Sequence, residues 1–123
     1  MAISGEYISL PGLVANATLA AKQYAPVRLA STANQIITAT ATTHLIVGVV
    51  QNDPAAGEAA VVAALGVCKA VAGTSTITKG ESLSANSTGV IDVTAGKVIG
   101  VALTAPIAKG DIITVLLSGL RPY

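Results

Sequence analysis

The stretch "LIVGVVQNDPAAGEAA" at residues 45–60 decides the fold prediction, because it is nearly repeated as "KVIGVALTAPIAKGDII" at residues 97–113. In each copy an apolar run rich in β-branched residues contains a glycine, and a proline follows six residues later. A glycine–acid pair comes next, and a second apolar run closes at another glycine. The matching positions are Gly48 and Gly100, Pro54 and Pro106, Gly57-Glu58 and Gly110-Asp111, and Gly66 and Gly119.

Each copy predicts a strand, a turn and a second strand. Asparagine and aspartate bond their own backbone in turns, proline fixes φ, and glycine permits a positive φ. A glycine inside a strand indicates a bulge, a bend or the close approach of another backbone. Two copies therefore predict two similar hairpins that pack across one core. The residues assigned to this framework are Val47, Gly48, Val49, Pro54, Gly57, Ile99, Gly100, Val101, Pro106 and Gly110.

The remaining segments also favour strands. "APVRLAS" predicts a short strand that starts beside Pro26, where the missing N–H suits a strand end. Residues 35–44 alternate with a period of two, and residues 60–71 predict a strand with both faces covered. Another short strand or turn is expected at 77–83, and a hairpin turn at 95–96. About eight short strands between glycine and proline turns predict an all-β fold, a small sandwich or barrel.

The N-terminal part is harder to assign. Residues 1–14 are expected to form an extended arm, and residues 15–123 a single β-domain. The alanine content of residues 15–24 favours one short helix there, while a strand with a loop is the alternative.

The scarcity of charge is the most informative feature of the composition. Charged residues make up 11% of the chain, whereas about 25% is usual. A folded chain of 12.1 kDa exposes roughly 6,000 Å², which thirteen charged side chains, seven basic and six acidic, cover thinly. We expect much of this surface to be buried against other chains. A neutral surface of threonine, serine and alanine is the alternative.

The same composition argues against several classes of partner. Net charge is +1 and the basic residues are scattered, which gives nucleic-acid binding little support. Polar residues interrupt the longest stretch that lacks acidic, lysine and arginine side chains, residues 29–52, so no membrane association is expected. The N-terminus lacks the basic and apolar regions of a signal peptide.

Little in the sequence points to catalysis. His44 and Cys68 are the only residues of their types, and a Cys–His pair is a known nucleophilic arrangement. Cys68 lies in an apolar run, however, where a free cysteine usually behaves as a small hydrophobe. No metal-ligand spacing is present, so we expect no enzyme, no metal and no cofactor.

Two binding functions remain as alternatives. Lys69 in "GVCKAV" distantly resembles the hairpin lysine of biotinyl and lipoyl carrier domains, although those domains present it at a tight turn. A carbohydrate-binding β-domain is the other alternative. It would require Tyr7, Tyr24 and Tyr123 to gather in one groove, because sugar sites usually use exposed aromatic rings.

Four segments together resemble the head decoration proteins, also called capsid cement proteins, of tailed bacteriophages. They are "GEYISL", "QYAPVRL", "LIVGVVQNDPAAGEAAVVAALGV" and "GKVIGVALTAPIAKGDIITVLLSG", and the likeness covers most of residues 5–119. The resemblance implies a small β-domain, commonly trimeric, that binds outside the capsid at local three-fold positions. It also implies that the chain has no enzymatic activity and no cofactor.

The expected partners are then the phage major capsid protein and further copies of this chain in a homotrimer. The resemblance places the protein on the outer surface of the virion after synthesis in the bacterial host cytoplasm. Its N-terminal arm could add a strand to a capsid protein and stabilise the shell by bridging neighbouring subunits. The alternative is that this segment is the first strand of the domain. The candidate contact residues are Ile3, Glu6, Tyr7, Ile8 and Leu10.

Overall fold

The fold was analysed in a computed structural model that describes residues 6–16, 19, 22–92 and 97–121. Within these ranges the chain forms ten β-strands and no helix, so the predicted all-β class is confirmed. The strands are β1 (Glu6–Leu10), β2 (Val14–Ala15), β3 (Pro26–Leu29), β4 (Gln35–Thr38), β5 (Gly48–Val50), β6 (Val62–Val71), β7 (Ser82–Asn86), β8 (Gly89–Asp92), β9 (Val98–Ala102) and β10 (Ile112–Arg121).

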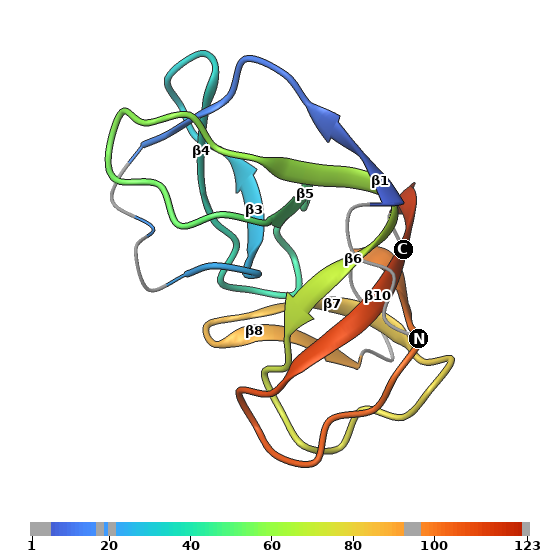
Figure 1. Ribbon diagram of the computed structural model, residues 1–123. Helices are drawn as coiled ribbons and strands as arrows, with labels where there is room; N and C mark the ends of the chain where they lie inside the picture. The colour runs from blue at the N-terminus through green and yellow to red at the C-terminus, as the bar shows by residue number, and fades with distance from the viewer. Residues whose placement is uncertain (1–5, 17–18, 20–21, 93–96, 122–123) are drawn as a thin grey trace.

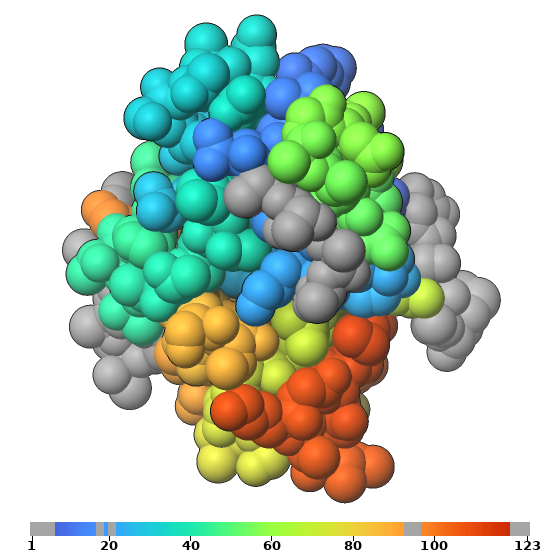
Figure 2. Space-filling model, turned by 90° about the vertical axis from the view of Figure 1, so that its left-hand side faces the viewer, coloured from blue at the N-terminus to red at the C-terminus, as the bar shows by residue number. Residues whose placement is uncertain are grey.

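The strand order is symmetric about its middle. It runs β2-β4-β3-β5-β6-β10-β9-β7-β8, and β1 pairs with β6 in addition. The hairpin β3–β4 is joined to β6 through β5, just as the hairpin β7–β8 is joined to β10 through β9. Figure 1 shows the result as two lobes with β6 running from one into the other. In Figure 2 the first half of the chain fills the upper lobe and the second half the lower one.

The first strand of each lobe, β1 in the first lobe and β6 in the second, also pairs in the same way. β1 is antiparallel to β6, as β6 is to β10. β2 follows β1 and lies parallel to β4; likewise Ala72 follows β6 and forms a parallel bridge to Val90 in β8. β6 therefore ends one structural unit and begins the next. This arrangement agrees with the two similar hairpins predicted from the repeated motif.

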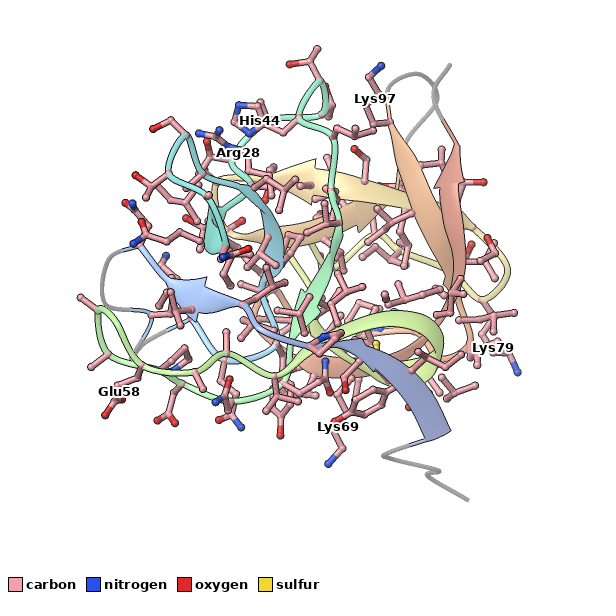
Figure 3. The ribbon with its side chains drawn as sticks, turned by 90° about the horizontal axis from the view of Figure 1, so that it is seen from above. Arg28, His44, Glu58, Lys69, Lys79 and Lys97 are labelled. Atoms are coloured by element: carbon pink, nitrogen blue, oxygen red, sulfur yellow. The ribbon has the colours of Figure 1, made fainter. Side chains whose placement is uncertain are left out.

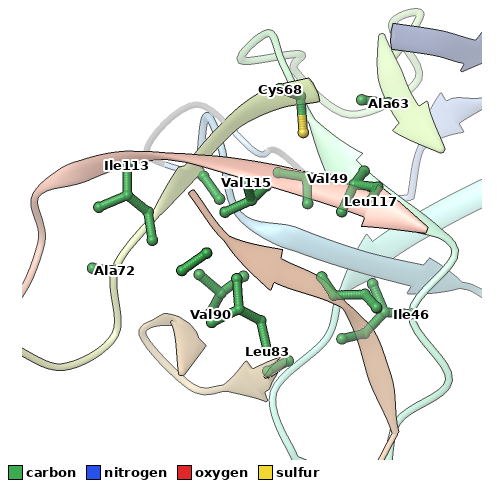
Figure 4. Packing of buried hydrophobic residues seen from close by; sticks show 14 of the residues in the cluster. Ile46, Val49, Ala63, Cys68, Ala72, Leu83, Val90, Ile113, Val115 and Leu117 are labelled. Carbon is green, nitrogen blue, oxygen red and sulfur yellow. The ribbon is translucent and has the colours of Figure 1, made fainter. Parts of the chain in front are cut away.

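Each lobe has its own cluster of buried side chains. The larger cluster fills the second lobe and extends to β5, and Figure 4 shows Ile46 and Val49 facing the same interior as Val90 and Val115. The smaller cluster fills the first lobe and consists of Ala15, Leu19, Val27, Ile36, Val50, Ala60 and Val62. The core thus consists of aliphatic side chains, as the absence of Phe and Trp requires.

An irregularity in β6 lets this strand serve both lobes. Ile8 pairs with Leu65 and Ser9 with Ala63, so Ala64 is an extra residue on β6. Inserting one residue turns the side chains that follow to the opposite face. Ala63 is accordingly buried in the large cluster, Leu65 is 43% exposed, and Cys68 is buried again. The prediction that β6 is covered on both faces holds at its start but is wrong at Leu65.

The two repeated glycines mark close approaches between backbones, as predicted. A Cβ on Gly48 would lie 2.2 Å from the carbonyl oxygen of Ala63 in β6. A Cβ on Gly100 would lie 2.0 Å from the carbonyl oxygen of Leu116 in β10. Because real carbon atoms do not approach oxygens so closely, each glycine permits the strand contact that closes its lobe.

Two predicted strands are shorter than expected. The strand expected over residues 35–44 ends at Thr38. The Ala39 N–H still bonds the Pro26 carbonyl oxygen of β3, but the Thr40 N–H bonds the His44 imidazole instead of a neighbouring strand. The strand expected over residues 45–50 comprises only Gly48–Val50.

The N-terminal assignments also differ from expectation. In the predicted helix, residues 15–24, the described residues form a strand end, a bend and a turn, while 17–18 and 20–21 lie outside the described ranges. Residues 6–10 of the predicted arm are β1, paired with β6 inside the domain. This part of the arm is a domain strand because Leu10 packs on the small cluster and Tyr7 on the large one.

Replacing either close-approach glycine should weaken the fold by forcing two strands apart. Gly48→Ala and Gly100→Ala are each expected to lower the free energy of unfolding by about 3 kcal/mol, the upper range for overpacking. Gly57→Ala is the control: no atom lies within 4 Å of the added carbon, and only its φ of +82° opposes alanine, at about 1 kcal/mol. Chemical denaturation measures all three, and equal losses would contradict the close-approach assignment.

Candidate interaction surfaces

The contact residues predicted from sequence lie on or beside β1, except Ile3, which falls outside the described ranges. Ile8 is 65% exposed, whereas Tyr7 and Leu10 are half-buried against the core. For Glu6 only the backbone is described, and it pairs with Val67. β6 occupies one edge of β1, and no strand in the described part of the chain pairs with the other edge. β1 therefore presents an open edge with one large apolar side chain.

An apolar groove of about 320 Å³ lies beside β1. It brings Leu10 together with three predicted framework residues, Val47, Gly48 and Ile99. The remaining lining residues are Ile46, Ala64, Leu65 and Leu117. Since every lining side chain is aliphatic or absent, the groove offers a surface for apolar contact and almost no side-chain hydrogen bonding.

The outer face of β6, β10 and β9 is a second apolar surface. Leu116 in β10 pairs with Val67 on one side and Val101 on the other. Two residues away Thr114 pairs with Lys69, and beyond it Ile112 pairs with Val71. Leu116 and Ile112 are 37% and 49% exposed. Apart from Thr114 and Lys69, this outer sheet face is thus apolar where a solvated sheet normally carries polar residues.

Val101 was among the predicted framework residues, whereas Leu116 and Ile112 were not predicted to have a role. The signal was present in "DIITVLLSG", where the inward face holds Ile113, Val115 and Leu117. The intervening positions are also apolar except for Thr114. A strand that is apolar on both faces indicates that both faces are covered.

The loop before β10 presents a third apolar feature. Ile107 is 93% exposed, yet its backbone is held. One carboxylate oxygen of Asp111 accepts the N–H groups of Ile107 at 2.8 Å and Ala108 at 3.0 Å. The Thr104 hydroxyl oxygen accepts the N–H of Thr114 at 2.9 Å. Ile107 is therefore exposed on a loop with a fixed conformation.

The same acid-bonded turn occurs three times. Gly57, Gly80 and Gly110 have φ values of 82°, 86° and 95° and are each followed by an acid. Glu58 accepts the Ala55 N–H, and Glu81 accepts both the N–H and the hydroxyl of Thr78, all at 2.8 Å.

The bonds at Glu81 and Asp111 favour the ionised carboxylates. The backbone N–H of Thr78 is the main cause that lowers the pKa of Glu81, and its hydroxyl contributes. The N–H groups of Ala108 and Ile107, in that order, lower the pKa of Asp111.

The two residues considered for nucleophilic catalysis, Cys68 and His44, lie in different parts of the fold. Cys68 is buried in the large cluster, and burial raises the pKa of its thiol to about 12, so it carries a proton at neutral pH. His44 lies in a surface groove beside Arg28. The two do not form a nucleophilic pair. In the described ranges no group of three His, Cys, Asp or Glu side chains could hold a metal ion.

The structure describes the lysine of the proposed carrier site, but only part of the proposed carbohydrate site. Lys69 lies within β6, with its Nζ 5.9 Å from the centroid of the Tyr24 ring, so it is not presented at a turn. Tyr7 packs against the large cluster, and Tyr123 lies outside the described residues. Among the residues described, no helix has both the length and the apolar character needed to cross a membrane.

Comparison with known proteins gives a structural match. No family model and no curated protein matches the chain. Among solved structures, the chain is similar to the N base of the head fiber protein gp8.5 of bacteriophage phi29. The TM-score is 0.69 at 15% sequence identity, and the match covers 90% of this chain and 93% of the other. The two proteins share a fold, and the neighbour is a component of a phage head, in agreement with the resemblance seen in the sequence.

The Asp111 turn should make stability depend on pH. Because bonding lowers the folded-state pKa of Asp111, its stabilisation is present above the ordinary value of 3.8 and is lost as the pH falls through the lower folded-state value. Asp111→Asn, which keeps an acceptor but cannot ionise, should be less stable than the wild type at pH 7 and should approach it near pH 2.

The control is Asp111→Ala, which removes the acceptor at every pH and should stay less stable than the wild type throughout. Chemical denaturation at a series of pH values measures these differences. A constant difference between wild type and Asp111→Asn would contradict the proposed role of the ionised carboxylate.

Proposed function

We propose that this chain is a structural protein of a phage virion. In this proposal it binds the outer surface of the capsid as a homotrimer and stabilises the shell by bridging neighbouring major capsid proteins. The observation that carries the proposal is the apolar outer face of β6, β10 and β9 on a fold shared with the base of a phage head fiber.

The apolar outer face supports self-association. The chain exposes 6030 Å², close to the roughly 6,000 Å² expected of a monomer of its mass. Thirteen charged residues are spread over this area. Monomers rarely leave large contiguous apolar patches in water, so a sheet face with Leu116 and Ile112 at its centre favours coverage by another chain. In a cyclic trimer that face would contact a different surface of the next copy, for which the Ile107 loop and the apolar groove are candidates.

The open edge of β1 supports the capsid contact. From the sequence we expected a free N-terminal arm to add a strand to a capsid protein. Because β1 is already paired with β6, the proposal becomes that a capsid-protein strand pairs with the outer edge of β1, next to Ile8 and the apolar groove. Main-chain hydrogen bonds then supply affinity. Three such edges in one trimer would bind together, so weak single contacts could still hold the shell.

The alternatives receive less support from the described residues. A carbohydrate site needs hydrogen-bonding side chains and aromatic rings, and the apolar groove lacks both. A carrier domain needs an accessible lysine at a turn, and Lys69 lies within β6. No enzymatic activity, cofactor, nucleic acid or membrane forms part of the proposal.

Placing a charge on the outer sheet face should block self-association. Leu116→Glu puts a carboxylate between Val67 and Val101, which is costly to bury. Sedimentation velocity at tens of micromolar should show trimers for the wild type and monomers for Leu116→Glu. Val61→Glu is the control. It places the same charge at a valine that is 40% exposed, and this variant should stay trimeric. A monomeric wild type, or a Leu116→Glu trimer, would refute the assigned interface.

Placing a charge beside the open edge of β1 should weaken attachment to the particle. Ile8→Lys is expected to lower cosedimentation with capsids of the encoding phage at least tenfold, because Ile8 is the exposed apolar side chain in the described part of β1. Deleting residues 1–10 is a poor test, since it also removes the β1–β6 pairing. Thermal melting checks that Ile8→Lys is folded. Unchanged attachment of a folded Ile8→Lys protein would show that β1 is not the contact.

A further inference from the structure

A second surface groove, in the first lobe, has a different chemistry from the apolar one. It has a volume of about 290 Å³ and is formed by the end of β3 and the loop that leads to β5. Its lining residues are Arg28, Leu29, Thr43, His44, Leu45 and Val47. Figure 3 shows the Arg28 and His44 side chains next to each other on this side of the molecule. The groove therefore combines nitrogen donors with exposed leucines.

Arg28, which lines this groove, has an unpaired donor. Its backbone is fixed in β3 by pairing with Ile37 of β4. Its Nε atom is buried and has no hydrogen-bond partner within the described part of the chain. Leaving a buried donor unpaired costs free energy, and the cost is larger for a charged group. A bound acceptor at this position would remove that cost.

His44 adds a second donor. Its Nδ1 accepts the N–H of Thr40 at 2.9 Å, so the ring carries its hydrogen on Nε2 and can donate from there. Thr43 adds a hydroxyl to the same lining. The backbone N–H of Lys97 bonds the carbonyl oxygen of Thr42 at 3.0 Å, which brings a further cation to this side (Figure 3). No acidic residue is among the lining residues.

These donors suit a carboxylate. A planar guanidinium matches the two oxygens of a carboxylate, and such charge-assisted bonds are strong. The rim of the groove indicates the source of that carboxylate, because Leu29 and Leu45 are 56% and 47% exposed. A small free anion would leave both leucines in water, whereas an acidic side chain on a protein surface would cover them. Arginine is enriched in protein interfaces and at their strongest contacts, where the surrounding residues exclude water.

We infer that this groove binds an aspartate or glutamate side chain of the protein to which the chain docks. The inference rests on the proposed function, under which that protein is the major capsid protein. Arg28 and His44 donate to the carboxylate, and Leu29 and Leu45 pack on apolar residues beside it. The groove thus supplies charge specificity, and the open edge of β1 supplies main-chain pairing.

The first test uses the isolated chain and does not depend on the particle. In nitrogen-15 spectra the Arg28 Nε–H signal should shift saturably when sodium acetate is added, while sodium chloride at equal ionic strength has no such effect. The Arg28→Lys variant lacks this Nε–H signal and therefore identifies it. In that variant acetate should no longer shift the signals of the residues around position 28. The absence of a saturable shift would overturn the inference, as would sodium phosphate saturating the site at one tenth of the acetate concentration.

The second test uses particles of the encoding phage that lack this chain. Arg28→Gln should lower cosedimentation at least tenfold, and Arg28→Lys, which keeps the charge but not the planar fork, should fall between it and the wild type. Lys79→Gln removes a positive charge from the second lobe and should bind within twofold of the wild type. If Arg28→Gln binds like the wild type, the inference is wrong while the proposed function stands. If the wild type does not bind, the proposed function fails and the capsid assignment fails with it.

Discussion

The structure depends on one strand that belongs to two lobes. β6 pairs with β1 and β5 in the first lobe and with β10 in the second. At the start of this ten-residue strand, Val62 faces the small cluster and Ala63 the large one. The extra residue at Ala64 then shifts the alternation, so that Cys68 also faces the large cluster. The repeated glycines Gly48 and Gly100 then let β5 and β9 approach β6 and β10 closely.

This arrangement has a consequence for the surface. The large cluster needs inward-facing aliphatic residues on β6, β9 and β10, and the outward positions of the same strands are largely aliphatic too. Leu116 therefore lies between Val67 and Val101 on the side away from the core. With so few charged residues in the chain, the fold leaves this sheet face suited to contact with another protein. The chain shares its fold with the base of a phage head fiber.

Much of the fold could be predicted from sequence because the repeated motif is local. Gly48 and Gly100 each follow an apolar run and precede a proline–glycine turn, which fixes a hairpin without knowledge of the rest of the chain. The glycine–acid turns at Glu58 and Asp111 were equally local, although the bonds that their carboxylates accept were not predicted. The length of β4 was not predictable, because the bond from Thr40 to the His44 ring ends the alternation that the sequence continues.

The candidate surfaces were less predictable because they depend on pairing between distant segments. β1 could have been a free arm, and only its register with β6 shows that Tyr7 and Leu10 face the core while Ile8 does not. Arg28 and His44 are sixteen positions apart, and nothing in either segment indicates that they share a groove. The scarcity of charge predicted a covered surface, but not which face of which strands.

Electron microscopy of the phage particle with and without this chain would show directly whether the chain binds the capsid as a trimer. We expect added density outside the capsid at local three-fold positions, in groups of three copies whose β6–β10–β9 faces are buried between subunits. Density from isolated copies with that face in solvent, or no difference between the two particles, would contradict this expectation.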